Sequence, residues 1–381
     1  MSRGVAILGS TGSIGRSTLQ VLQRHSEDFH VVALTAYGSG DLLCEQAAAV
    51  GASYAGLVDG SKTNCERGGV VLAAGPECLI EAATRPDADV VLNAVVGAAG
   101  LQATLAALRA GKRVALANKE TLVMAGELVL AAAEDGGGEI VPVDSEHSAV
   151  LQCLGGARRG DLRRLILTAS GGPFREWTAE QLRGATLDEA LRHPTWDMGP
   201  KITVDSATLA NKALEVIEAH HLFGLGYDAI EVVVHPQSIV HAFTEFVDGS
   251  VLAQVGFPTM ELPILYALTH PDRRPDAGAQ WFDPVAAGPL TFETLRQGDF
   301  PAFRLGVEAG AAGGTAPAVY NASNEVAVDA FLEGRISFGM IGEMIETVLQ
   351  SHDVQPAGDL ETVLAADSWA RERGEALCYS R

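Results

Sequence analysis

The sequence is poor in positive charge, and lysine is the scarcer of its two basic residues. The 381 residues include 27 lysines and arginines against 48 aspartates and glutamates, a formal net charge of -21, and only five of the 27 are lysines. Such a negative field repels nucleic acid and anionic membrane surfaces, so we expect neither as a partner. A phosphorylated substrate would need a local group of positive charge. Each lysine within a polar motif is therefore a candidate ligand.

Cysteines and long apolar runs are also scarce. The five cysteines are odd in number and form no CxxC pair, so we expect reduced thiols in a cytoplasmic protein. No run of about 18 apolar residues predicts a membrane span. The first apolar strand begins at Val5, which leaves no room for a signal or transit peptide. Hydrophobic residues make up 47% of the chain, enough for two or three domains with cores of their own.

A glycine-rich turn follows the first strand pattern. Residues 5–8, VAIL, lead directly into GSTGSIG and then into a helical pattern over residues 17–24. Between a strand and a helix, such a turn brings backbone N–H groups close to a pyrophosphate at the positive helix end. The spacing of Gly9, Gly12 and Gly15 is GxxGxxG rather than GxGxxG, so a merely tight turn is the alternative. We predict that the turn binds a dinucleotide.

The second strand pattern, residues 30–36, bears on which dinucleotide is bound. It ends without the acid that recognises the ribose 2′-hydroxyl of NAD, and Gly38 and Ser39 follow where that acid would stand. This favours NADP, although no basic residue is present there to bind a 2′-phosphate. Strand and helix patterns then alternate to residue 143, which predicts a doubly wound parallel sheet.

Two acids follow the last strand of this region in VPVDSEHSAV. In an extended chain, Asp144 and Glu146 would point to one face and Ser145 to the other. One interpretation is a solvated strand end that opens a helix, with Asp144 or Ser145 as its N-cap. The other is part of a site for a hard divalent cation such as Mg²⁺ or Mn²⁺, which prefers oxygen ligands. A third ligand would decide between them.

Further polar motifs lie in the second half of the chain. The ASGG turn at residues 169–172 follows a strand pattern, and its amides either bind an anion or form a simple tight turn. From Ala207 onward the apolar spacing is helical, which places Asn211, Lys212 and Glu215 within one turn. An ordinary exposed ion pair is the alternative there.

Two histidines raise the question of zinc. His235 and His241, with Glu245 nearby, have neither an HxxxH nor a zinc-finger spacing. The alternation of apolar residues over 232–256 instead predicts a hairpin with Asp-Gly at its turn.

Taken together, the motifs resemble one family. GSTGSIG, ANKETLV, VPVDSEHSA, ASGGPF, HPTWDMG, KITVDSATLANKALE, HPQSIVHA and NASNEVAVDAF occur in this order along nearly the whole chain and are similar to those of the 1-deoxy-D-xylulose 5-phosphate reductoisomerases. The resemblance implies an NADPH- and divalent-metal-dependent (Mg²⁺ or Mn²⁺) conversion of that substrate to 2-C-methyl-D-erythritol 4-phosphate, in isoprenoid precursor synthesis, by a homodimer.

The patterns and the resemblance together predict an α/β chain. We expect an N-terminal doubly wound Rossmann-like domain over residues 1–143 and a central α+β catalytic and dimerisation domain over 144–270. A linker over 271–298, marked by prolines and little periodicity, would lead to a C-terminal helical bundle over 299–381.

The resemblance also implies site residues. The metal ligands would be Asp144, Glu146 and Glu215. The substrate phosphate would be held by Ser170, Ser206, Asn211 and Lys212, and its carbon skeleton surrounded by Lys119, Ser145 and His193. NADPH would be lined by Thr11, Gly12, Ser13, Ile14, Gly38, Ser39, Asn118, Glu120 and Gly199. Residues 193–199 resemble a lid in which Trp196 covers the substrate, so the catalytic set is Lys119, Glu146, His193 and Trp196.

The sequence departs from the family pattern at three positions, and two other functions stay open. Thr259 and Glu261 stand where aspartate and arginine are usual, and Ala213 replaces a common glycine. The alternatives are an NADP-dependent dehydrogenase of the semialdehyde or homoserine type, and a redox-sensing NADP-binding protein without turnover. Neither needs three convergent carboxylates, so metal-dependent oxidation of NADPH would distinguish them.

Overall fold

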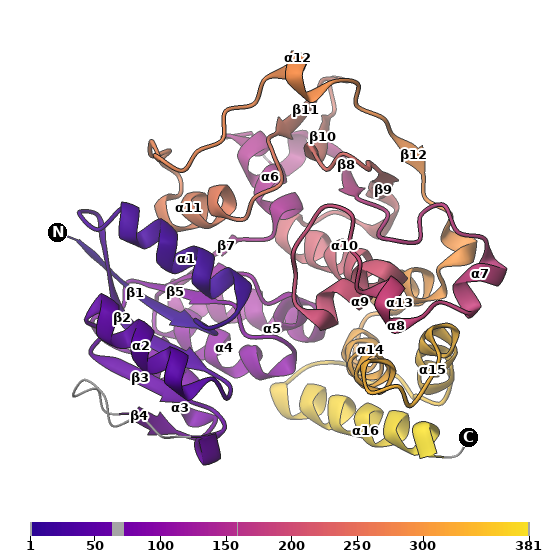
Figure 1. Cartoon of the computed structure of the whole chain (residues 1–381), viewed down its shortest axis with the longest axis horizontal. Coiled ribbons are helices and arrows are strands. Elements are labelled where there is room, and N and C mark those ends of the chain that lie inside the picture. The colour runs from indigo at the N-terminus through magenta and orange to yellow at the C-terminus, as the bar shows by residue number, and fades with distance from the viewer. Residues whose placement is uncertain (1, 63–71, 158, 380–381) are drawn as a thin grey trace. The chain divides into compact units, whose positions relative to one another are not determined.

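The computed structural model describes residues 2–62, 72–157 and 159–379 of the chain (Figure 1). The chain forms two compact units, the first from residues 1–121, 129–148 and 259–280 and the second from residues 122–128, 149–258 and 281–381. Both units are built from segments distant in sequence. The four-segment division expected from the sequence stays a prediction.

A seven-stranded parallel sheet forms the centre of the first unit. Its strand order is β4-β3-β2-β1-β5-β6-β7, which confirms the doubly wound sheet predicted from the sequence. The elements are β1 (Arg3–Leu8), α1 (Ser13–Arg24), β2 (Phe29–Ala36), α2 (Gly40–Val50), β3 (Tyr54–Leu57), η1 (Gly60–Lys62), β4 (Leu72–Ala74), α3 (Glu77–Ala83), β5 (Val90–Asn93), η2 (Ala98–Gly100), α4 (Leu101–Arg109), β6 (Arg113–Leu116), α5 (Lys119–Gly136), β7 (Glu139–Pro142) and α11 (Glu261–Thr269).

The central strands of this sheet and its strand order indicate the edge at which a ligand would bind. Residues 5–8 of β1 and residues 90–92 of β5 are almost fully buried, as expected for central strands covered on both faces. The strand order reverses between β1 and β5. In open sheets of this kind, ligands bind beyond the carboxyl ends of the strands at that point.

A mixed five-stranded sheet and a group of helices form the second unit. The strand order is β11-β10-β8-β9-β12, with β8 and β9 parallel and the other neighbours antiparallel. The elements are α6 (Ser145–Leu154, whose first turn belongs to the first unit), η3 (Arg159–Asp161), β8 (Leu162–Ala169), α7 (Ala179–Arg183), α8 (Leu187–Ala190), α9 (Pro200–Thr208), α10 (Ala210–Phe223), η4 (Tyr227–Ala229), β9 (Ile230–Val234), β10 (Val240–Phe246), β11 (Val251–Val255), α12 (Pro284–Ala287), β12 (Glu293–Thr294), η5 (Gln297–Asp299), α13 (Pro301–Ala312), α14 (Ala316–Leu332), α15 (Phe338–Gln350) and α16 (Leu360–Tyr379).

Several predictions for the second unit are confirmed. β10 and β11 form the expected hairpin, and Gly249 in its turn has a φ of 86°. The helices α14, α15 and α16 pack together, as Figure 1 shows in orange and yellow. They make up the expected C-terminal helical region.

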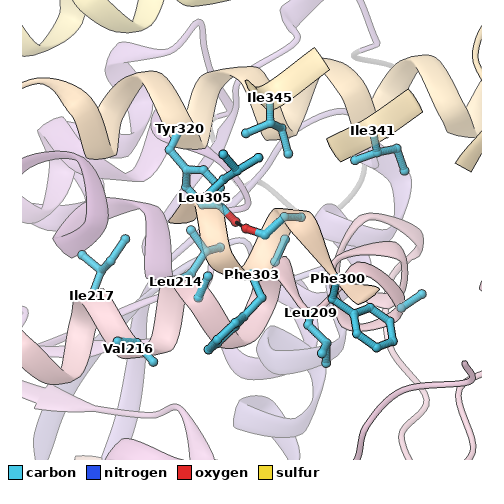
Figure 2. Close-up of a cluster of buried hydrophobic side chains, with 14 of the residues drawn as sticks. Leu209, Leu214, Val216, Ile217, Phe300, Phe303, Leu305, Tyr320, Ile341 and Ile345 are labelled. Atoms are coloured by element: carbon cyan, nitrogen blue, oxygen red, sulfur yellow. Dashed lines mark hydrogen bonds between the residues drawn. The ribbon is translucent and has the colours of Figure 1, made fainter. Parts of the chain in front are cut away.

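The core of the second unit joins α10 to the C-terminal helices. Figure 2 shows Leu214 of α10 beside Phe303 and Leu305 of α13 and Tyr320 of α14. The Tyr320 hydroxyl is fully buried and donates to the Ala302 carbonyl at 2.9 Å, so its polar group is satisfied inside an apolar core. This core holds α10, and with it the polar turn at its start, in one place.

The helical pattern expected from Ala207 onward is interrupted. α9 ends at Thr208 and α10 begins at Ala210, because Leu209 between them has a left-handed backbone with a φ of 61°. The leucine side chain is 3% exposed and belongs to the core of the second unit. Apolar spacing alone could not reveal this break, since leucine is a good helix former.

The departures from the family pattern are accommodated by their surroundings. Glu261 accepts a hydrogen bond from Arg24 of α1 at 2.6 Å, and Arg24 also binds Asp276. Ala213 is fully buried in α10, where it lies against Gly306 of α13.

The cysteine prediction is only partly confirmed. Cys78, Cys153 and Cys378 are not disulfide-bonded, whereas Cys44 is, so the expectation of a reduced thiol is wrong for Cys44. Cys65 lies outside the described residues. Among the helices of the described ranges, none combines the length and the apolar character that a membrane crossing requires.

Candidate active site

The glycine turn after β1 is shaped by close backbone packing. Gly9 has a φ of 85°, and a Cβ there would lie 2.6 Å from the Ala94 carbonyl oxygen. A Cβ on Gly15 would lie 2.4 Å from the Gly9 carbonyl oxygen. Both positions therefore require glycine. Gly12 is the N-cap of α1 and provides no side-chain cap, and no acid lies in the first turn. The positive end of α1 can thus receive an anion.

The predicted cofactor residues at this edge lie on the glycine turn and at the end of β2. Thr11 and Ile14 are half-buried, and Gly12 and Ser13 are exposed at the start of α1. The end of β2 leads to Gly38 and Ser39, where Ser39 is the N-cap of α2.

Asn118 organises the end of β6. Its side-chain amide donates to the Val95 and Gly97 carbonyls at 2.8 and 2.9 Å and to Glu120 at 2.8 Å. Its carbonyl oxygen accepts from the Thr121 amide and so caps α5. This network binds the loop after β5 to the loop after β6 and places Glu120 at the same edge as the glycine turn.

The acids of the VPVDSEHSAV motif lie at the start of α6. Asp144 precedes the helix and its carbonyl accepts from Ser148 at 2.8 Å, while Glu146 belongs to the first turn. The backbone therefore follows the interpretation in which a helix opens at Asp144 or Ser145, and the extended geometry considered for this pair is not adopted. Their carboxylate oxygens nevertheless lie within 4.8 Å of one another, because the chain bends from a strand into a helix between them.

A buried set of charges surrounds Asp144. Lys119 Nζ lies 2.6 Å from Asp144 Oδ2, and His147 Nδ1 lies 3.2 Å from the same oxygen. Burial acts to raise the pKa of Asp144, but the Lys119 ammonium and the His147 ring outweigh it and hold that pKa well below its usual range. Asp144 is thus an ionised oxygen donor at neutral pH. Ser145 Oγ donates to Glu146 at 2.5 Å.

The second unit carries a polar group around Ser170. His193 Nδ1 accepts from the Thr195 and Trp196 amides at 3.1 and 2.8 Å, so the ring proton lies on Nε2. That atom is 3.0 Å from Ser170 Oγ, which also accepts from the Gly172 amide at 3.2 Å. Burial lowers the pKa of His193 to about 4, so the ring is neutral. With two N–H groups donating to it, the Ser170 hydroxyl keeps its own proton for another acceptor.

The helix pair α9 and α10 meets the same turn. A Cβ on Gly172 would lie 2.7 Å from the Ser206 carbonyl oxygen, so the ASGG turn packs on the last turn of α9. Lys212 Nζ donates to the Thr168 carbonyl at the end of β8 at 2.6 Å and forms an ion pair with Glu215. Both side chains are buried. The alternative of an exposed helical ion pair is therefore wrong.

The other predicted site residues of the second unit include Asn211 of α10 and Trp196 and Gly199 of the segment that leads into α9. Asn211 Nδ2 donates to Glu215 at 2.5 Å. Trp196 lies half-buried in an irregular segment between α8 and α9, and Gly199 is the N-cap of α9. The loop predicted for residues 193–199 is confirmed, and its conformation is held by the ring of His193.

The sequence did not reveal that His147 is a partner of Asp144. His147 is fully buried beside Asp144, and its place three residues after Asp144 was a usable signal.

His235 was considered as a zinc ligand, but both of its ring nitrogens contact backbone groups. Nε2 accepts from the Ile239 and Val240 amides, each at 3.1 Å, and Nδ1 lies 2.8 Å from the Thr291 carbonyl. Its role is to shape the turn before β10.

The parallel sheet carries a glycine turn at its switch point, and no acid stands directly at the end of β2. These features define the class as a dinucleotide-binding protein, and the absence of that acid favours NADP. Comparison with known proteins specifies it further. Residues 5–126 match the family described as 1-deoxy-D-xylulose 5-phosphate reductoisomerase, and residues 140–223 and 255–373 match its C-terminal domains.

Relatives extend this likeness over the full length. The chain is 50% identical over 381 residues to 1-deoxy-D-xylulose 5-phosphate reductoisomerase of Symbiobacterium thermophilum, covering 98% of each chain. It is 50% identical to that of Mycobacterium avium, covering 97% of this chain and 92% of the relative. The structure of the Zymomonas mobilis reductoisomerase in complex with NADPH matches with a TM-score of 0.92 and 42% identity over 100% of both chains. A reductoisomerase in complex with NADPH, fosmidomycin and magnesium matches with a TM-score of 0.94 and 39% identity over 99% of this chain and 98% of that one.

The chain therefore belongs to the 1-deoxy-D-xylulose 5-phosphate reductoisomerase family, as the motifs indicated. Its activity is the NADPH-dependent rearrangement and reduction of 1-deoxy-D-xylulose 5-phosphate, with NADPH and a divalent cation as cofactors. This assignment excludes the two alternative functions, which were a semialdehyde or homoserine dehydrogenase and a redox sensor without turnover.

Proposed function

We propose the following roles for residues of the two units in this reaction. Asp144 and Glu146 of the first unit and Glu215 of the second hold the divalent cation. Ser170, Ser206, Asn211 and Lys212 hold the substrate phosphate, while Lys119, Ser145 and His193 surround its carbon skeleton. Thr11, Gly12, Ser13, Ile14, Gly38, Ser39, Asn118, Glu120 and Gly199 line NADPH. The product would be 2-C-methyl-D-erythritol 4-phosphate, a precursor in isoprenoid synthesis.

The donor set fits a hard divalent cation. Asp144 and Glu146 offer carboxylate oxygens within 4.8 Å of one another, and such oxygens suit Mg²⁺ or Mn²⁺. The Lys119 ammonium at 2.6 Å already compensates the charge of Asp144. Glu215 is 1% exposed and is oriented by Asn211 and Lys212, so a third carboxylate is held in a fixed rotamer.

When bound, the cation would polarise the substrate carbonyl and NADPH would supply the hydride. The chain's own residues have distinct tasks. Lys119, held at the start of α5, can stabilise negative charge that develops on a substrate oxygen. Ser170 can donate its hydroxyl proton to a phosphate oxygen, because its lone pairs accept from Gly172 and His193. Trp196, in the segment that His193 orders, would exclude water from the substrate.

The assembly and location of the protein are part of the same proposal. β11 lies at the edge of its sheet, and Val251 and Leu252 on it are both 49% exposed. Apolar residues on an uncovered edge strand favour pairing with a second copy, so a homodimer is expected. The cysteines Cys78, Cys153 and Cys378, which are not disulfide-bonded, favour a cytoplasmic location, whereas the disulfide of Cys44 does not.

One assay tests the catalytic proposal. The protein is first treated with a chelator, and NADPH absorbance is then followed with 1-deoxy-D-xylulose 5-phosphate in the absence and presence of Mg²⁺ or Mn²⁺. NADPH should be consumed only when substrate and metal are both present. Consumption without a divalent ion would contradict the assigned role of the three carboxylates. No consumption under any condition would contradict the activity itself.

A further inference from the structure

Gln46 of α2 makes two hydrogen bonds to one residue of the glycine turn. Its side-chain carbonyl accepts from Ser10 Oγ at 2.8 Å, and its side-chain amide donates to the Ser10 carbonyl at 3.1 Å. Ser10 is fully buried, and Gln46 is half-buried. Gln46 is 36 residues away from Ser10 in sequence and lies outside the glycine motif.

The bond to the Ser10 carbonyl has a consequence for the next amide. Because the peptide unit is planar and trans, its C=O and N–H groups point in opposite directions. When Gln46 holds the Ser10 carbonyl toward α2, the N–H of Thr11 must point away from α2. Thr11 is half-buried and is followed by the exposed Gly12 and Ser13, so this amide belongs to the part of the turn that faces a ligand.

The rest of the turn is fixed from other sides. The Gly9 and Ser10 amides both donate to the Thr35 carbonyl, at 3.1 and 2.8 Å, and Gly15 packs against Gly9 and Ser10 without space for a Cβ. The Gly12 amide also donates to the Gly9 carbonyl at 3.2 Å and closes the turn, but none of these bonds is made by the peptide unit between Ser10 and Thr11. The orientation of that peptide unit is held by the Gln46 side chain.

We infer that Gln46 is a positioning residue for NADPH, which presents the Thr11 amide to the cofactor pyrophosphate through Ser10. It touches no reacting atom. Because α2 begins at the end of β2, where the ribose phosphate of the cofactor would lie, Gln46 also connects the two phosphate-binding ends of the site. This inference rests on the proposed cofactor site.

The test compares Gln46→Met, which removes both bonds at similar volume, with Ser10→Ala, which removes only the hydroxyl bond. Glu45→Gln, at the exposed neighbouring position of α2, is the matched control. For Gln46→Met we expect the KM and the Kd for NADPH to rise about tenfold, the combined effect of two ordinary hydrogen bonds. The rise for Ser10→Ala should be about threefold. The control should equal the wild type, and kcat and the KM for the sugar phosphate should stay within about twofold throughout.

Direct titration of NADPH without substrate or metal separates the possible failures. If the wild-type protein does not bind NADPH, the proposed function fails. If the wild type binds and Gln46→Met binds equally well, the inference is overturned, as it is if kcat and both KM values change together, because that pattern indicates a general disturbance of α2. Should Gln46→Met not fold, Gln46→Glu decides instead, because it still accepts from Ser10 Oγ but cannot donate to the Ser10 carbonyl, and an unchanged Kd in that variant overturns the inference.

Discussion

The anion sites that we propose at the cofactor edge of the first unit and in the polar group of the second unit use different chemical groups. The glycine turn offers backbone amides, and its shape follows from positions such as Gly9 and Gly15 where a Cβ has no space. The group around Ser170 and Glu215 instead uses side chains that are already hydrogen-bonded to one another before any ligand arrives. Side-chain sites of this kind depend on neighbouring rotamers, so they should respond to single substitutions and to pH in ways that a backbone site does not.

The largest expected effect concerns Glu215. In Glu215→Gln one carboxylate of the proposed cation site is lost, and stabilisation worth several kcal/mol should disappear. We expect kcat/KM to fall roughly a thousandfold or more, with Mn²⁺ affinity weakened and NADPH affinity unchanged. Steady-state kinetics and titration of Mn²⁺ by electron paramagnetic resonance measure the two. A variant with normal activity would remove Glu215 from the metal site.

The second prediction concerns Gly126, a tightly packed glycine outside the cofactor turn. A Cβ on Gly126 would lie 2.3 Å from the His221 ring, and both residues belong to the second unit. Gly126→Ala should lower the free energy of unfolding by about 1–3 kcal/mol, the usual cost of overpacking. Gly160→Ala is the control, because no atom of the described residues, its chain neighbours aside, lies within 4 Å of its Cβ position. His221→Ala introduced into Gly126→Ala should recover part of the loss in urea unfolding, and no recovery would exclude the ring as its cause.

The next prediction concerns pH. Burial lowers the pKa of His193, and burial together with His220 lowers that of His221, each from 6.5 to about 4. Their stabilising contribution is complete above pH 6.5 and is lost as the pH falls toward about 4, because the unfolded chain then binds protons that the folded state rejects.

Urea unfolding should therefore show a decrease of about 1–2 kcal/mol per histidine over this range, reduced from the full linkage value by partial exposure. The conservative variant His221→Gln should have a flatter profile than the wild type. An identical slope would show that His221 does not carry this dependence.

The smallest effect is expected for an ion pair of the first unit. Glu261→Gln weakens a pair with Arg24 whose two side chains are 28% and 26% exposed, so the loss should be about 0.5 kcal/mol. Added salt should reduce the difference between variant and wild type. Arg24→Met should cost more, since Arg24 also binds Asp276. A large effect of Glu261→Gln that does not depend on salt would contradict the modest contribution that we assign to this partly exposed ion pair.

The parts of the fold and site that the sequence predicted are those with a local physical cause. Strand, turn and helix around Gly9 follow from short-range pattern, and the acids after β7 lie at a strand end because parallel strands end at one edge. The pattern left two geometries open for these acids, extended and helix-opening, and the structure adopts the second. Glu215 was assigned to the metal only through the family resemblance, because nothing in the local pattern connects it to Asp144. The partner of Glu261 is 237 residues distant, beyond any local rule.

Leu209 illustrates a compromise between chain conformation and core filling. Glycine would adopt the left-handed backbone of position 209 without strain, whereas for leucine this conformation costs roughly 1 kcal/mol or more. The side chain nevertheless sits among the apolar residues of Figure 2, where a missing leucine would leave a void that is more expensive than the strain. The bend between Ser206 and Asn211 is thus stabilised by the burial of the Leu209 side chain. A smaller residue at this position would relieve the backbone strain but leave a cavity in the core that supports α10.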